Sequence, residues 1–130
     1  MRSSSPSVTG RAWTFRFVCL LAALVLGCSR PVAKIQLDLD SIEPDGLRGA
    51  AGGRVSVAYE LCVPATQQVY VEVRRIEPAL EIHEGSAGRV GCAPNQALVL
   101  GTTNGIGWRA KLEQLAALPY VAEIREAHFE

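Results

Sequence analysis

The stretch Val55-Ser56-Val57-Ala58-Tyr59-Glu60-Leu61-Cys62 alternates large apolar side chains with small or polar ones. A period of two is typical of a β-strand with one buried face, because successive side chains point to opposite sides of a strand. This alternation is the clearest strand signal in the chain. It predicts a sheet whose buried face includes Val57, Tyr59 and Leu61.

After Pro64 the apolar residues follow a three- and four-residue spacing, which is typical of a helix. The residues with this spacing are Ala65, Val69, Val73 and Ile76. We expect a helix over residues 65–77, opened at its first turn by Pro64 and ended at Pro78. Because the run from Val69 to Val73 also alternates, a strand is the alternative for this segment.

The rest of the chain also has the apolar patterns of short strands and helices. The predicted elements are a short strand around Leu80–Ile82, a glycine-rich loop over residues 85–91, a strand over Ala97–Thr102, a helix that begins at Trp108 and ends before Pro119, and a last strand within Val121–Phe129. The order strand, helix, strand, strand, helix, strand is the pattern of ferredoxin-like folds. We therefore expect an α+β domain, in which both helices cover one face of an antiparallel sheet.

The residues before this domain carry weaker signals. The segment from Lys34 to Ile42 alternates, which predicts an extra N-terminal strand, and Pro44 to Gly53 reads as a flexible break. The predicted domains are a signal peptide over 1–27, a tether and N-terminal segment over 28–53, and a ferredoxin-like domain over 54–130.

The first residues have the three parts of a secretory signal. Arg2, Arg11 and Arg16 precede the uncharged apolar run from Phe17 to Gly27, which ends in a small residue. Eleven residues at a rise of about 1.5 Å each cover about 16 Å, whereas the hydrocarbon core of a bilayer is about 30 Å thick. The run is therefore too short to serve as a transmembrane helix.

The run ends in Val25-Leu26-Gly27-Cys28, which resembles the lipobox of bacterial lipoproteins, although Leu26 is bulkier than the usual residue. The resemblance implies that the Cys28 thiol receives a diacylglycerol thioether and that Cys28 becomes the new N-terminus. This N-terminus is then acylated by a fatty acid such as palmitate. The protein would then be held on the inner or outer membrane, facing away from the cytoplasm. The alternative is an ordinary secretory signal cut near Gly27, with an unacylated Cys28.

Charge and composition exclude two broad classes. Thirteen Lys and Arg residues balance thirteen Asp and Glu residues over the 130 residues, and 48% of the chain is hydrophobic. Removal of residues 1–27 takes away three arginines and no acid, which leaves ten basic and thirteen acidic residues and a net charge of −3. This balance is that of a globular domain and excludes a strongly basic nucleic-acid binder or an acidic disordered tail.

The four cysteines divide by position. Cys19 leaves with the signal and Cys28 is used by the lipid, so that Cys62 and Cys92 remain. Two cysteines in an exported domain usually form a disulfide, worth about 3–4 kcal/mol in the chain-entropy model for a loop of this length. The predicted topology places the end of the first core strand beside the start of the third, which makes this bond feasible. A redox pair or metal site is the alternative, but the chain has no C-x-x-C spacing.

Two glycine-rich segments invite a binding interpretation. Gly105 to Ala110 matches the G-x-G-x-x-A dinucleotide fingerprint, but Trp108 is large where the backbone must approach a pyrophosphate, so we expect only a turn. Residues 85–91 contain three glycines and Arg89, and their amides and guanidinium are candidates for binding an anion. The alternative for this loop is a connection tied down by Cys92.

We do not expect the histidines, the cysteines or the aspartates to form a metal site. His83 and His128 fall on strands predicted at opposite edges, and the thiols are expected to be oxidised. Asp38, Asp40 and Asp45 suggest calcium, but Ile42 occupies a position where the calcium loop needs a ligand. We interpret these aspartates as a solvated strand face.

No nucleophile or base with an orienting partner can be assembled from these residues, so we expect a protein without enzymatic activity or cofactor. The preferred function is a membrane-anchored binding or accessory module of the cell envelope, whose open sheet face or free edge receives a protein or peptide partner. Nucleic acid is not expected, because that face would show Ser56, Ala58 and Glu60 rather than stacking aromatics.

Two alternatives come from other classes. The pattern Leu112-x-x-Leu115-x-x-Leu118-Pro119-Tyr120-Val121-x-x-Ile124 resembles the tail of subtilisin propeptide and inhibitor domains, over about a dozen residues. That resemblance implies protease inhibition or a chaperone role on a ferredoxin-like fold. The second alternative is a small-ligand or anion-binding protein that uses the loop around Arg89.

Overall fold

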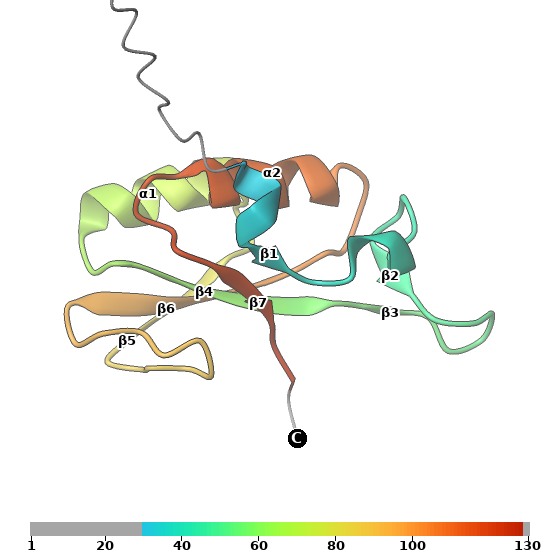
Figure 1. Cartoon of the computed structure of the whole chain (residues 1–130), viewed down its shortest axis with the longest axis horizontal. Coiled ribbons are helices and arrows are strands. Elements are labelled where there is room, and N and C mark those ends of the chain that lie inside the picture. Colours follow the sequence, from blue (N-terminus) through green and yellow to red (C-terminus); the bar gives the residue numbers. More distant parts are fainter. Residues whose placement is uncertain (1–29, 129–130) are drawn as a thin grey trace, which may run out of the picture.

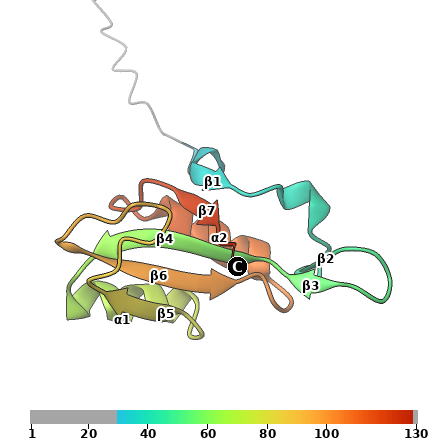
Figure 2. The ribbon, with the colours of Figure 1, turned by 90° about the horizontal axis from the view of Figure 1, so that it is seen from below.

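The computed structural model describes residues 30–128, and in it the alternating stretch from Ala58 onward forms the middle strand of a five-stranded sheet (Figures 1 and 2). Strand β4, Ala58–Pro64, pairs antiparallel with β6, Gln96–Thr102, over its whole length. Strand β5, Glu81–Glu84, flanks β6, and β7, Ile124–Glu126, lies antiparallel on the other side of β4. Strand β1, Ile35–Gln36, joins β7 in parallel, which gives a mixed sheet in the order β1-β7-β4-β6-β5.

Two helices cover one face of this sheet (Figure 1). Helix α1, Gln67–Ile76, joins β4 to β5, and helix α2, Trp108–Ala117, joins β6 to β7. The helix predicted over 65–77 is thus confirmed, and its strand alternative is wrong. The chain is therefore an α+β protein, as expected.

The start of α1 differs from the prediction. Pro64 does not open the helix but ends β4, where it pairs with Gln96. Thr66 is the N-cap instead, and its Oγ1 accepts the N–H of Val69 at 3.3 Å. A threonine just before a run with helical spacing is a recognised N-cap signal, and it was available in the sequence.

The core fills the space between the helices and the sheet. Its fully buried large side chains are Leu61, Val63, Val73, Val99, Leu112, Leu115, Val121 and Ile124. Tyr59 lies directly opposite Gly101 across β4 and β6, and a Cβ on Gly101 would come within 2.5 Å of the tyrosine ring. The ring therefore covers the glycine, which explains why this strand position has no side chain.

The N-terminal strand predicted from Lys34 to Ile42 is largely wrong. The segment forms a 3₁₀ turn η1 at Pro31–Lys34, the two residues of β1, and a second 3₁₀ turn η2 at Leu39–Ser41. Its buried residues are Ile35, Leu39 and Ile42, with spacings of four and three rather than two. The chain bends so that each of these residues reaches the core, which a straight strand would not allow.

The glycine-rich run expected as a flexible break contributes to a hairpin instead, made of β2, Leu47–Arg48, and β3, Val55–Ser56. Thr103 ties this hairpin to the sheet. Its buried Oγ1 donates to the carbonyl of Gly46 at 2.6 Å and accepts the N–H of Val57 at 3.0 Å. Because the Val57 amide is used in this way, the predicted strand is divided into β3 and β4.

The predicted signal peptide 1–27, Cys28 and Phe129 lie outside the described residues. Within residues 30–128, no helix has the length and apolar character needed to cross a membrane.

Candidate functional site: a strapped sheet face with a charged basin

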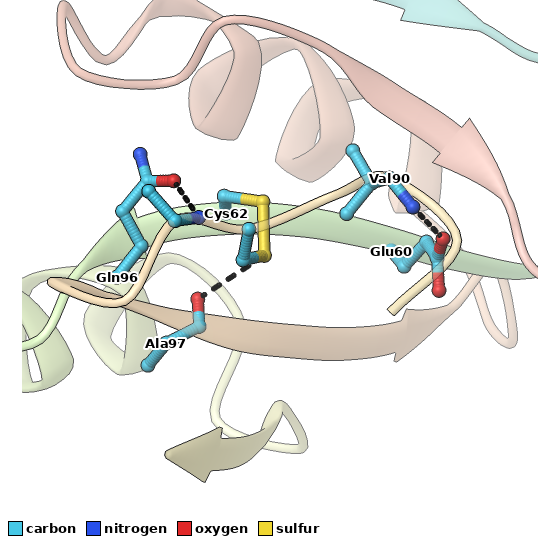
Figure 3. Close-up of a disulfide and its surroundings, with 7 residues drawn as sticks. Glu60, Cys62, Val90, Gln96 and Ala97 are labelled. Atoms are coloured by element: carbon cyan, nitrogen blue, oxygen red, sulfur yellow. Dashed lines mark hydrogen bonds between the residues drawn. A yellow bond between two sulfur atoms is a disulfide. The ribbon is translucent and has the colours of Figure 1, made fainter. Parts of the chain in front are cut away.

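The face of the sheet opposite the helices, called here the outer face, is crossed by the segment between β5 and β6. We name residues 85–95 the strap. A disulfide joins Cys62 of β4 to Cys92 of the strap, with 5.3 Å between their Cα atoms, which confirms the predicted pairing (Figure 3). At the far end of the strap, the side-chain oxygen of Gln96 accepts the N–H of Ala93 at 2.8 Å.

The strap also binds a carboxylate of the chain itself. Glu60 is only 4% exposed, and its Oε1 accepts the N–H of Val90 at 2.5 Å (Figure 3). Gly88 has a φ of +60°, and a Cβ there would lie 2.6 Å from Leu98 Cδ1 and 3.2 Å from Glu60 Oε2. The positive φ favours glycine at this position, and a side chain there would also displace the Leu98 side chain beneath the strap.

The expectation that the sheet face is open and displays Glu60 is therefore wrong. For residues 85–91 the sequence leaves two interpretations, an anion-binding loop or a connection tied down by Cys92, and the structure shows the disulfide of Cys92 to Cys62. At least one of its amides, that of Val90, is already occupied by an internal carboxylate. Arg89 is exposed and also takes part in contacts within the fold.

Beside the strap lies a concavity of about 400 Å³, which we call the basin. It is lined by Gln36, Glu60, Arg89, Arg125, Glu126 and His128. Three of these residues share one row across the sheet, because Arg125 of β7 is directly opposite both Gln36 of β1 and Glu60 of β4. The basin therefore combines side chains from three neighbouring strands, the strap and the end of the described chain.

The two carboxylates of the basin already have partners. Glu60 accepts the Val90 amide, and Glu126 is held by both terminal nitrogens of Arg48, with one of these contacts at 3.0 Å. The Arg48 hydrogen bonds and charge outweigh the effect of burial and lower the pKa of Glu126. The Nδ1 atom of His128 lies 4.0 Å from Glu126 Oε1.

Arg125 is in the opposite situation. Its side chain is exposed, and among residues 30–128 the guanidinium makes no hydrogen bond or ion pair. A planar guanidinium with five donors is suited to bidentate contact with a carboxylate or phosphate. The imidazole of His128 and the amide of Gln36, whose Nε2 also donates to the carbonyl of Ala33 at 3.4 Å, line the basin beside it.

The other predicted positions are not brought together. His83 is on β5 beside Leu98, and His128 follows β7, with β6 and β4 between these two strands. In the described part of the chain, no group of three or more His, Cys, Asp or Glu side chains could hold a metal ion.

The three aspartates considered for calcium do not share a strand face. Asp38 and Asp40 are exposed around η2, so their assignment to a strand is wrong. Asp45 accepts the N–H of Leu47 at 3.1 Å and pairs with Arg54 at 2.8 Å. These contacts make Asp45 a hairpin-stabilising residue.

The G-x-G-x-x-A segment forms a turn, as expected. Gly105 and Gly107 have φ values of +93° and +82°, and Ile106 between them is 92% exposed. Trp108 is buried, and its Nε1 donates to the carbonyl of Glu43 at 2.9 Å. The indole is thus part of the packing between α2 and the N-terminal segment.

Sequence reasoning did not identify Gln36, Arg125 or His128 as parts of one site. The signal was incomplete: alternation from the buried Ile124 assigns Arg125 to the outer face, but not its neighbours across the sheet. No protein-family model, curated protein or solved structure matches this chain.

Proposed function

We propose that the protein is a lipid-anchored, non-enzymatic binding module of the bacterial cell envelope, and that the basin binds a carboxylate or phosphate group. The observation that carries this proposal is Arg125, an exposed guanidinium that lacks a partner among residues 30–128 and is flanked across the sheet by Gln36 and Glu60. Function is therefore assigned to a surface rather than to a reactive group.

The charges around the basin favour a small anion over a polyanion. Arg125 and Arg89 line it together with His128, while Glu60 and Glu126 are already satisfied by an amide and by Arg48. Outside the basin, exposed acids such as Glu81 and Glu84 lie on the same sheet. These acids would repel a nucleic acid or other dense polyanion, whereas a single carboxylate or phosphate can be matched by the basin.

Support for the anchor comes from the sequence, through the lipobox resemblance at Cys28. A diacylglycerol thioether on this residue would retain the module on the inner or outer membrane. We also propose that the domain has the ferredoxin-like topology. Its support is the antiparallel order β7-β4-β6-β5 with both helices on one face, to which β1 adds an edge strand (Figure 2).

The mature protein, extracted from envelopes, tests both parts. Its intact mass reports the acyl groups and the loss of residues 1–27. Its melting temperature in a panel of carboxylates and phosphates reports binding, and a ligand at about ten times its Kd adds about 1.4 kcal/mol, or about 6–10 °C for a domain of this size.

We expect at least one anion of the panel to raise the melting temperature of the wild type and not that of R125Q. The matched control is R54Q, which removes an exposed arginine from the hairpin and should retain the shift. No shift with any anion, together with no Arg125-dependent partner in cross-linked envelopes, would overturn the binding proposal. A cross-linked partner without a response to free anions would indicate that the carboxylate or phosphate belongs to a macromolecule.

A second candidate function, protease inhibition or a propeptide-like chaperone role, is favoured by the strand order just given together with the resemblance over Leu112–Ile124. A fold shared with such domains supports this candidate only by analogy. Inhibition of subtilisin-type proteases by the mature protein is the corresponding measurement, and its absence would remove this candidate.

A further inference from the structure

We propose that the helix-covered side of the domain lies against the anionic phospholipid headgroups of the membrane that holds the anchor. The basin then points away from the bilayer. This inference rests on the proposed lipid anchor and adds an orientation to it. We define the helix layer as residues 30–34, 67–77 and 108–117, which comprise Arg30, η1, both helices and the C-cap Glu77 of α1.

The first argument is the distribution of charge. The helix layer carries three acids, Glu72, Glu77 and Glu113. Its basic residues number six, which gives a net charge of +3, and they are Arg30, Lys34, Arg74, Arg75, Arg109 and Lys111. The remaining described residues carry four basic and nine acidic side chains, a net charge of −5 with histidine neutral. The helix layer is thus attracted to an anionic surface, and the rest of the described domain is repelled.

Most of the basic side chains of the helix layer are exposed. Arg30, Arg74, Arg75 and Arg109 are exposed. All three acids already have partners, because Glu77 accepts from Lys111 Nζ at 2.8 Å, Glu72 accepts from the hydroxyl of Tyr120 at 2.7 Å, and Glu113 Oε1 lies 3.5 Å from Arg109 Nε. Val32 and Val71 add apolar surface to the same layer, at 47% and 51% exposed.

The second argument is the length of the tether and where it ends. The described chain begins at Arg30 on the helix side of the sheet, and its last described residues lie on the other side (Figure 1). Turn η1 is held there by the Nζ of Lys34, which donates to the carbonyl of Leu118 at 3.3 Å.

Only Ser29 and Arg30 separate Cys28 from Pro31. Three Cα steps of at most about 3.6 Å span about 11 Å. Electrostatic forces are screened over about 8–10 Å at physiological salt. A lipid on Cys28 would therefore hold η1, and helix α2 that packs beside it, at no more than about one screening length from the headgroups.

The test uses tryptophan reporters on the two sides of the protein. V71W places an indole on the exposed face of α1, and E81W places one on the edge strand β5. Both variants keep the buried Trp108 as a common background. The mature chain is reconstituted in vesicles that contain brominated phosphatidylglycerol, whose bromine atoms quench indoles close to the bilayer.

We expect V71W to lose most of its added fluorescence and E81W to lose little. Replacing the anionic lipid with brominated phosphatidylcholine, or adding 0.5 M salt, should reduce the difference between the two, because both changes weaken the electrostatic attraction. Equal quenching at the two positions, or stronger quenching of E81W, would overturn the orientation. Self-association through the helix layer, seen as dimers without quenching of V71W, would overturn it as well.

A matched pair of charge reversals separates charge distribution from net charge. R75E alters the helix layer and R54E alters the hairpin, and each lowers the net charge by two. Combined with V71W, R75E should reduce the quenching and R54E should leave it unchanged. The same response to both reversals would contradict an orientation set by the helix layer.

The anchor and the orientation can fail independently. Intact mass shows before reconstitution whether Cys28 is acylated. If it is not, coupling the Cys28 thiol to a maleimide-bearing lipid supplies the tether, and the quenching pattern still decides the orientation. An unacylated mass therefore counts against the proposed anchor, and the absence of a V71W–E81W difference counts against the docked helix layer.

Discussion

The two faces of the central sheet are built by different physics from one strand. On β4, Tyr59, Leu61 and Val63 point toward the helices and are almost completely buried in an apolar core. Glu60 and Cys62 alternate with them and face the strap, where a disulfide and a carboxylate–amide hydrogen bond hold the cover in place. Burial of apolar surface therefore stabilises one face, whereas a disulfide and a hydrogen bond stabilise the cover of the other.

This difference has a functional consequence. A face sealed by two helices can hardly change without unfolding, whereas a face covered by an 11-residue strap leaves part of its surface accessible as the basin. Loops on a rigid scaffold commonly carry binding residues for this reason. Substitutions on the two faces should therefore have separable effects.

Substitutions in the core on the helix side should lower the free energy of unfolding the most. Leu61→Ala removes a side chain that is 0% exposed, and we expect it to lower the free energy of unfolding by about 2–5 kcal/mol. Urea unfolding followed by Trp108, the one tryptophan left after loss of residues 1–27, measures this value. Val71→Ala, on the exposed side of α1, should change it by less than about 0.5 kcal/mol.

On the strap face, the covalent link should have the larger effect. We expect C62A/C92A to cost about 3–4 kcal/mol, chiefly by releasing the loop constraint in the unfolded chain. Far-ultraviolet circular dichroism should remain close to that of the wild type, because both helices pack on the opposite face. Loss of the helical signal at 25 °C would show that the two faces do not form independently.

Loss of the internal Glu60 carboxylate should have the next largest effect on stability. Glu60→Ala leaves the Val90 amide without its acceptor, at an expected cost of about 1–3 kcal/mol, whereas Glu60→Gln retains an acceptor oxygen and should cost less. Hydrogen exchange of the Val90 amide provides the direct measurement. Unchanged protection of that amide in the alanine variant would contradict the assigned role of Glu60.

The smallest expected effect is the contribution of Glu77 to the loss of stability at low pH. Burial opposes ionisation of Glu77, but hydrogen bonds from Lys111 and from the amide of Ala79 outweigh it and lower the pKa of this carboxyl below 4.5. A carboxyl with a lowered pKa in the folded state contributes stability above its unfolded pKa, and this contribution is lost as the pH falls through the folded value.

Unfolding measured from pH 6 to pH 2 should therefore show a decline below about pH 4.5 that is shallower in E77Q. K111Q removes the donor and should flatten the profile in the same way. Identical profiles for the wild type and both variants would show that this pair does not contribute to the acid sensitivity.

Much of the helix side was predictable from the sequence because its signals are local. Alternation around Tyr59 identified β4, and three- and four-residue spacing identified α1 and α2. The pairing of Cys62 with Cys92 was also predicted, since a count of cysteines and the expected strand order left one choice.

The N-terminal segment and the basin were not predictable, because non-local partners decide them. Alternation suggested a strand around Leu37, but the core reaches this segment only at Ile35, Leu39 and Ile42. Arg125 becomes the neighbour of Gln36 only through the parallel pairing of β1 with β7, residues 89 positions apart in the chain. No local pattern contains information about such a pairing.

The order of apolar and polar residues along the chain by itself determined which segments become helices and core strands, since side-chain periodicity must match backbone geometry. Only the tertiary structure decided how the second face of the sheet is used. The direction in which the strap crosses that face, the enclosure of Glu60 beneath it and the exposure of Arg125 beside it all depend on contacts between distant segments. Such contacts are selected by the packing of the whole domain, not by the preferences of neighbouring residues.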